Sequence, residues 1–280
     1  MTRTHGNDEN GGNEFPVSRG LTLWVVMLAA SVAVQAAQTP ASTASSRPAP
    51  AYRLDVATIA GPAGPAGLRV AVRNASDNSL VRHFEPAHEK PLDLFVVGRD
   101  LRFFRHLYPV LLPDGSLEAR EEIPPGEYLV AADFLPSGGS PQFLHRVIDA
   151  RGDSRGPRRT EIPTPGSAGD AFDVVTNVRI QPLSARLPAG EPTAFHVMLS
   201  RTEDGRPIVN LEPVLGGGGH LLAVREDLTE VVHAHASVAG LPVSLLTFDM
   251  TLPKPGAYVV WVEFRRFGET LTARLSVTAR

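Results

Sequence analysis

The stretch "KPGAYVVWVEF", residues 254–264, decides the fold class of this chain. Large apolar residues occupy every second position from Tyr258 to Phe264, whereas Trp261 and Glu263 occupy positions between them. Alternation with a period of two predicts a β-strand that buries one face against a core and turns the other face away from it. The Pro-Gly pair in front of the strand is typical of a turn. The same alternation in "AFHVMLS", residues 194–200, and the near absence of helical periodicity predict an all-β protein.

This pattern occurs twice along the chain. The earlier copies are "PPGEYLVAADF" at 124–134, which aligns with 254–264, and "LFVVGRDLRFFRHLYP" at 94–109, which aligns with "LLAVREDLTEVVHAHA" at 221–236. The order of the two motifs is kept, and their spacing is kept to within about three residues, so a duplicated domain explains them. The fold class that we predict is therefore two tandem antiparallel immunoglobulin-like β-sandwiches after an N-terminal signal or anchor segment.

Two stretches rich in proline, glycine and small residues mark the domain boundaries. They are "TPASTASSRPAP" at 39–50 and a second run over 149–170, and neither can bury enough apolar area to offset the entropy of ordering. We predict a signal peptide or N-terminal membrane anchor at 1–38, a flexible linker at 39–52, a first β-sandwich at 53–148, a linker at 149–172 and a second β-sandwich at 173–280.

The apolar segment "LTLWVVMLAASVAVQAAQ", residues 21–38, predicts export. It follows Arg19, leads to "VQA" at 34–36 as a candidate cleavage site, and is short for the roughly 20 residues of a membrane span, so it resembles the core of a signal peptide. The acidic residues before it are untypical of a signal peptide, which leaves an uncleaved anchor in the cytoplasmic membrane as the alternative. Either way, the location that we expect is periplasmic or extracellular.

Composition excludes several classes of function. The chain has no cysteine, which excludes disulfides, thiolate metal sites and cysteine nucleophiles. Its formal net charge of −3 offers no sustained basic field, so nucleic acid is not an expected partner.

The histidines of "HLLAVREDLTEVVHAH", residues 220–235, are the candidate site. In a strand, His233 and His235 point to the same face about 6.6 Å apart, and His220 joins them if a turn at Asp227 folds the stretch into a hairpin. Three neutral imidazoles with an open fourth position suit zinc or copper(II). The alternative is that these histidines line the edge of a sandwich and form hydrogen bonds with backbone groups. Nitrogens more than about 8 Å apart would exclude the metal site.

Together, the "DL" turn, the His-x-His pair and the strand at 254–264 resemble the YtkA-like and FixH-like exported bacterial β-domains. The resemblance covers roughly 53–148 and 173–280, is stronger in the second part, and implies small immunoglobulin-like modules of largely unassigned function. It places His220, His233 and His235 on the family's histidine pattern. The first part departs from this pattern because Asp93 aligns with His220 and Tyr108 aligns with His235, leaving His106, while His88 lies in a different register.

No catalytic or cofactor-binding residue is assigned, because the chain has no nucleophile elbow, zinc-protease motif or nucleotide fingerprint. The glycines of "GGGGH", residues 216–220, predict a bulge or a close backbone approach. We therefore expect an exported, non-catalytic binding or accessory protein linked to copper or zinc through His220, His233 and His235. The alternative is a structural or protein-interaction module of the cell envelope, with an envelope protein as its partner and no metal ligand.

Overall fold

The structure is a computed structural model that describes residues 51–61, 64–86, 90–150, 173–175, 177–236 and 244–280. Residues Ala49–Arg280 form one compact unit. The segment expected to be a signal peptide or anchor, residues 1–38, lies outside the described residues, as do nearly all of both expected linkers. The domain boundaries therefore stay predictions.

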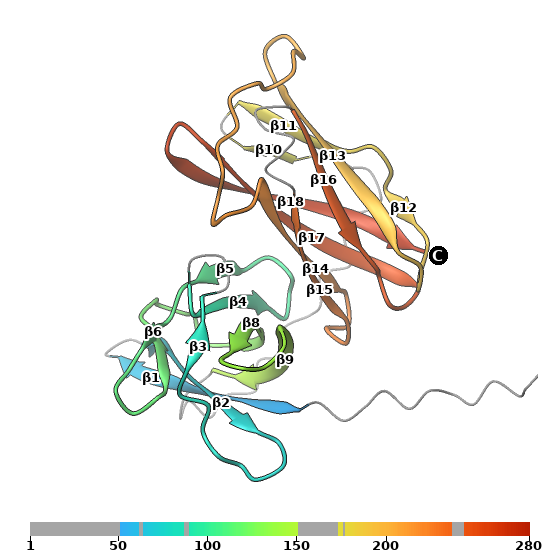
Figure 1. The fold of residues 1–280 in the computed structure, drawn as a ribbon. Helices are drawn as coiled ribbons and strands as arrows, with labels where there is room; N and C mark the ends of the chain where they lie inside the picture. The colour runs from blue at the N-terminus through green and yellow to red at the C-terminus, as the bar shows by residue number, and fades with distance from the viewer. Residues whose placement is uncertain (1–50, 62–63, 87–89, 151–172, 176, 237–243) are drawn as a thin grey trace, which may run out of the picture. The chain divides into compact units, whose positions relative to one another are not determined.

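Every regular element in the described residues is a β-strand (Figure 1), which confirms the predicted all-β fold class. The strands of the first part are β1 Tyr52–Gly61, β2 Gly64–Asn74, β3 Phe84–Glu85, β4 Leu92–Gly98, β5 Phe104–Leu107, β6 Val110–Leu111, β7 Leu117–Ala119, β8 Glu127–Pro136 and β9 Gln142–Asp149. Those of the second part are β10 Asp173–Val175, β11 Val178–Pro182, β12 Arg186–Leu187, β13 Thr193–Arg201, β14 Gly219–Arg225, β15 Val231–Ala236, β16 Leu245–Met250, β17 Gly256–Arg266 and β18 Glu269–Ala279. We call Tyr52–Asp149 the first repeat and Asp173–Ala279 the second repeat.

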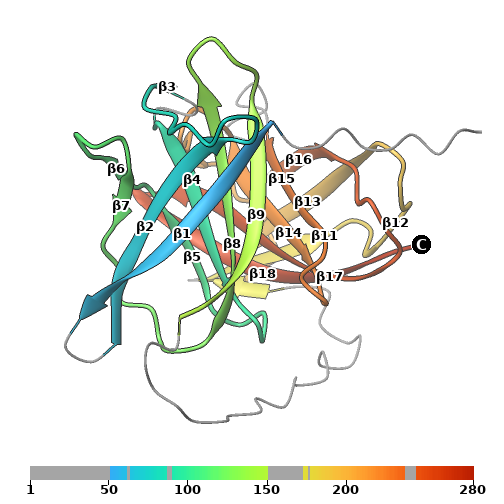
Figure 2. The same ribbon diagram turned by 90° about the horizontal axis from the view of Figure 1, so that it is seen from below.

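The strands form three sheets. In the first repeat, a sheet of order β1-β2-β7-β6, whose long β1–β2 hairpin is visible in Figure 2, is accompanied by a five-stranded sheet of order β3-β8-β4-β5 with β9 also paired to β8. In the second repeat, the strands pair in the order β10-β11-β13-β16-β15-β14-β17-β18-β12. All these pairings are antiparallel except that of the short strand β12, which runs parallel to β18.

Each repeat has its own hydrophobic core. In the first repeat, Leu68 and Val70 of β2 pack in one buried cluster with Leu94 of β4 and Val130 of β8, which joins the two sheets as a sandwich. In the second repeat, the predicted inward residues from Tyr258 to Phe264 lie in the core. The alternation in these strands therefore predicted the core-facing residues correctly.

A tyrosine marks the same corner in both repeats. The Tyr128 hydroxyl donates a hydrogen bond to the Pro124 carbonyl at 2.5 Å, and the Tyr258 hydroxyl donates one to the Lys254 carbonyl at 2.9 Å. A buried tyrosine that bonds the backbone four residues upstream resembles the tyrosine corner of immunoglobulin-like sandwiches. The two corners lie at aligned positions in the sequence, which supports the duplication.

Strand pairing around these corners is the same in both repeats. The order β5-β4-β8-β9 in the first repeat corresponds to β15-β14-β17-β18 in the second. The connecting turns also match, because Leu101 and Leu228 adopt positive φ angles of 56° and 64° and donate to Gly98 and Arg225 carbonyls at 2.8 Å. The two repeats therefore share this part of their topology.

The expectation that these strands have only one buried face is wrong. The alternation predicts that Trp261 and Glu263 lie on the face turned away from the core, yet the two residues are only 2% and 7% exposed. Every residue of β4 is buried as well. The physical reason is a third hydrophobic cluster, which packs this second face of the first repeat against that of the second.

Candidate functional site: a histidine–carboxylate cluster

The candidate histidines lie on one hairpin formed by β14 and β15. His220 pairs directly with His235, and Leu222 pairs with His233. Because side chains alternate across a strand, Leu221 and Ala234 enter the core of the second repeat while the three histidines share the opposite face. The hairpin predicted from the Asp227 turn is therefore present.

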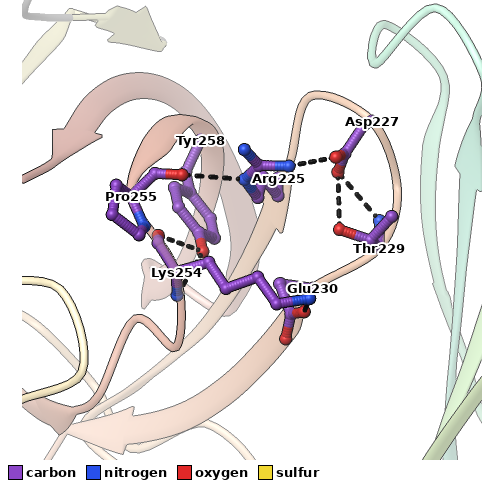
Figure 3. Close-up of polar contacts among 7 residues, drawn as sticks. All are labelled: Arg225, Asp227, Thr229, Glu230, Lys254, Pro255 and Tyr258. Atoms are coloured by element: carbon purple, nitrogen blue, oxygen red, sulfur yellow. Dashed lines mark hydrogen bonds and ion pairs between the residues drawn. The ribbon is translucent and has the colours of Figure 1, made fainter.

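Polar contacts fix the turn of this hairpin against β17 (Figure 3). Asp227 pairs with Arg225 and accepts hydrogen bonds from the Thr229 amide at 3.0 Å and its hydroxyl at 2.8 Å. Arg225 also donates to the Pro255 carbonyl at 3.0 Å. Gly256 has a φ of 139°, which residues with a side chain rarely adopt, and a Cβ there would lie 2.8 Å from Arg225 Nε, so glycine is favoured at this position. These contacts hold the histidine strands in a defined register.

A second glycine allows the close approach at the other end of the hairpin. A Cβ at Gly219 would lie 2.9 Å from the carbonyl oxygen of Glu263 on β17. The "GGGGH" stretch thus provides a close backbone approach, as its glycines predicted. It brings His220 into register with Glu263.

The structure brings the three candidate ligands together. His220, His233 and His235 each offer a ring nitrogen, and these nitrogens lie within 4.8 Å of one another. The His235 ring lies 4.4 Å from that of His220 and 4.3 Å from that of His233, measured between centroids. His220 is 1% exposed and also approaches the Val214 carbonyl at 3.2 Å. The ring nitrogens are therefore close enough to one another to share an ion.

The face that carries these histidines packs against the equivalent face of the first repeat. The third cluster joins buried residues of both repeats, and its members occupy aligned positions: Phe95 with Leu222, Val97 with Val224, Leu101 with Leu228, Leu129 with Val259, and Ala131 with Trp261. An interface in which the same patch is used on both sides is isologous, as in a two-fold dimer. The two repeats therefore pack as a pseudo-dimer within one chain.

Two reciprocal histidine–carboxylate pairs cross this interface. His106 Nδ1 lies 2.6 Å from Glu263 Oε2, and His233 Nδ1 lies 2.7 Å from Asp133 Oδ2. His106 aligns with His233, and Asp133 aligns with Glu263, so each repeat supplies a histidine and an acid from equivalent positions. Phe95 lies between the pairs, with its centroid 4.2 Å from the His106 ring and 4.7 Å from that of His233.

Opposing influences act on the pKa of His106. Burial, the largest influence, lowers the pKa, but the neighbouring carboxylates of Asp93 and Glu263 together outweigh it and raise the pKa from 6.5 to about 9. His106 is thus an imidazolium at neutral pH. Burial also raises the pKa of Tyr108, with further contributions from Glu263 and Asp93, so this hydroxyl stays protonated.

Sequence reasoning missed four members of this cluster: Asp93, His106, Asp133 and Glu263. In the sequence, His106 and Asp93 belong only to the part that departs from the histidine pattern. The alternation predicts an outward position for Glu263. The alignment of His106 with His233 was the available signal. The period-two pattern could not show that the outward faces of two repeats meet.

The side chains that converge in the cluster are imidazoles and carboxylates, which are groups that can hold a metal ion. Glu263 accepts a hydrogen bond from the Thr272 hydroxyl at 3.2 Å, so this hydroxyl faces a carboxylate and not a histidine base. Two surface hollows, one lined by residues such as Asp55 and Arg69 and the other by residues such as Thr202 and Phe267, contain no residue of the cluster. In the described part of the chain, no helix is long and apolar enough to cross a membrane.

Comparison with known proteins found one similarity to a family model, and it is confined to the second repeat. Residues 173–280 match the family described as "Domain of unknown function (DUF8832)". No curated protein matches the chain. The comparisons give no support to the YtkA-like or FixH-like resemblance.

Solved structures with a similar arrangement are β-rich and distant in sequence. Domains 4 and 5 of the S-layer protein SbsC have 12% identity and a TM-score of 0.24, covering 81% of this chain and 97% of that one. The FN1–FN3 domains of chicken CNTN1 have 10% identity and a TM-score of 0.22, covering 80% and 64%. The Yersinia pseudotuberculosis adhesin InvE has 13% identity and a TM-score of 0.20, covering 81% and 58%. This chain spans less than two thirds of the last two. None of these likenesses carries an argument about function, which we draw from the site instead.

Proposed function

We propose that this chain is an exported, non-catalytic module of the cell envelope that acts through binding or as a structural element. The observation that carries the proposal is the isologous packing of the two repeats. The sheet faces that hold the polar cluster are used to join the repeats, and they are buried rather than opened to a substrate pocket. An enzyme needs such a pocket beside its acid and base groups.

The envelope location is part of the same proposal and rests on residues 21–38. Export through a cleaved signal would place the module in the periplasm or outside the cell, whereas an uncleaved segment would tether it to the cytoplasmic membrane. N-terminal sequencing of the chain from its own host should begin near Ala37. Full-length protein in the membrane fraction supports the tether, and full-length protein in the cytosol contradicts the proposal.

Binding to an envelope protein is tested by photo-crosslinking in intact cells. Phe267 is 73% exposed at the turn between β17 and β18, so a photoreactive residue there faces outward. We expect a discrete adduct with one envelope protein. The control position is Asp77, which is exposed in a polar turn of the first repeat. The same diffuse mixture of crosslinked adducts at both positions, or no adduct at either position, would contradict an interaction role.

Metal handling is the second candidate function, favoured by the convergence of His220, His233 and His235 within 4.8 Å. Three imidazoles of this kind suit zinc or copper(II). The chain purified from its own host should contain close to one metal ion per molecule by mass spectrometry. The double variant His233→Ala, His235→Ala should contain none. Equal metal content in parent and variant would contradict this candidate.

A further inference from the structure

Asp93 is a buried carboxylate whose hydrogen-bonding capacity is unused. It lies on β4 of the first repeat at 0% exposure, and neither oxygen accepts a hydrogen bond from any residue that the structure describes. The Nε2 atom of His106 lies 3.8 Å from Asp93 Oδ1, which is beyond hydrogen-bonding distance. A carboxylate buried without a hydrogen bond is disfavoured, because it has lost its hydration and the ion pair with His106 at 3.8 Å compensates for that loss only in part. Its presence points to a ligand.

The orientation of His233 indicates what that ligand is. A carboxylate accepts hydrogen bonds but does not donate them, so the bond to Asp133 places a proton on His233 Nδ1, and in the neutral ring that binds metals Nε2 then carries the lone pair. This Nε2 is buried and has no hydrogen bond to the described residues. A histidine oriented by a carboxylate on one nitrogen, with the other nitrogen open, is the usual arrangement around a protein-bound metal.

Asp93 is connected with the group of three histidines by His220, which belongs to both sets of converging side chains. Ligand atoms of Asp93, His106 and His220 lie within 4.8 Å of one another, and His220 also belongs to the group with His233 and His235. In the sequence alignment, Asp93 is the counterpart of His220. The position that supplies an imidazole in the second repeat therefore supplies a carboxylate in the first, and both face the same cluster.

We propose that Asp93 of the first repeat completes the metal site formed by His220, His233 and His235 of the second repeat. This inference rests on the metal-handling candidate. Three imidazole nitrogens leave a fourth position open on zinc or copper(II), and the Asp93 carboxylate fills it and neutralises part of the ion's charge. The ion then holds the two repeats together, because its ligands come from both sides of the interface.

The test measures binding of Zn²⁺ and Cu²⁺ to the full chain by isothermal titration calorimetry and thermal unfolding with and without metal. We expect Asp93→Asn to weaken metal binding by at least about 10–100-fold, the range for loss of a group that only supports a metal ligand, because Asp93 contacts the ion directly in this proposal. The same variant should lower the Tm of the metal-loaded chain more than that of the metal-free chain, because the ligand role acts only when the ion is bound. A carboxylate with only a structural role would lower both Tm values equally.

Controls separate the possible failures. Asp249→Asn, which changes an exposed carboxylate of β16, should leave metal affinity unchanged. If the parent binds no metal, metal handling and the role of Asp93 are both overturned. If the parent binds, the double variant of His233 and His235 does not, and Asp93→Asn binds like the parent, only the role of Asp93 is overturned. Asp93→Ser gives the same decision if the asparagine variant fails to fold.

Discussion

The two repeats keep the same packing face but differ in the polar residues on it. Both use aligned apolar positions at the interface, and both contribute one histidine, His106 or His233, to a carboxylate of the other repeat. The positions beside these histidines differ: Asp93 and Tyr108 in the first repeat correspond to His220 and His235 in the second. The two repeats therefore share the apolar residues of the interface, while the imidazoles are concentrated in the second repeat and a carboxylate of the first repeat lies opposite them.

Loss of the largest side chain at the interface should have the largest effect. Trp261 is 2% exposed and stacks on Phe104 with a centroid distance of 5.2 Å. Trp261→Ala should lower the free energy of unfolding by about 3–5 kcal/mol, because it removes a large buried ring and leaves a cavity. Urea denaturation measures the loss. Phe267→Ala, at a 73% exposed position, should change the free energy by less than about 0.5 kcal/mol. Equal losses would show that the interface is not a stabilising core.

The reciprocal pairs should respond unequally to removal of their acids. Glu263→Gln should cost about 1.5–3 kcal/mol of unfolding free energy, because its side chain is 9% exposed and its bond joins a charged histidine. Asp133→Asn should cost less, since the Asp133 side chain is 20% exposed. Denaturation of both variants in the presence of a chelator compares them. A larger loss for Asp133→Asn would contradict the order inferred from burial.

The dependence of stability on pH above neutrality should come from His106 of the first repeat. The pKa of His106 is about 9 in the folded chain and about 6.5 when unfolded, so its contribution is complete below pH 6.5 and is lost as the pH rises through 9. The shift corresponds by linkage to a loss on the order of 3 kcal/mol, comparable to that expected for Glu263→Gln. Denaturation of metal-free protein between pH 6 and 10 measures it. His106→Gln should flatten this part of the profile, and an unchanged slope would contradict the assignment.

The tyrosine corners should give the smallest effects and nearly equal ones. Tyr128→Phe and Tyr258→Phe each remove one hydrogen bond to a carbonyl four residues upstream. Each should cost about 0.5–1.5 kcal/mol by thermal unfolding. A large loss in one repeat and none in the other would show that the aligned corners are not equivalent.

Much of the fold could be predicted from the sequence because it depends on local patterns. Alternation from Tyr258 to Phe264 identified the residues of the second core, and the Asp227 turn identified the hairpin that brings His220 to His235. The interface could not be predicted in this way. A strand that packs on both faces can still alternate in residue size, so the burial of Trp261 and Glu263 depends on a second sheet distant in the sequence.

The same limit applies to the site. Spacing within one hairpin grouped His220, His233 and His235, because strand geometry fixes which side chains share a face. The acids Asp93 and Asp133 belong to strands of the other repeat, and no local pattern connects them with β14 or β15. His88, noted for its different register, lies outside the described residues.

The isologous face has a consequence for self-association. Because each repeat presents a patch that fits the other, the first repeat of one molecule can also pair with the second repeat of another, producing a domain-swapped dimer. Covalent connection within the chain favours internal pairing, since it keeps the partner patch at an effective concentration of about millimolar. Exchange should therefore become significant only at comparable protein concentrations or during refolding, when both patches are exposed together. The feature that makes one chain resemble a dimer thus also determines how that chain would misassemble.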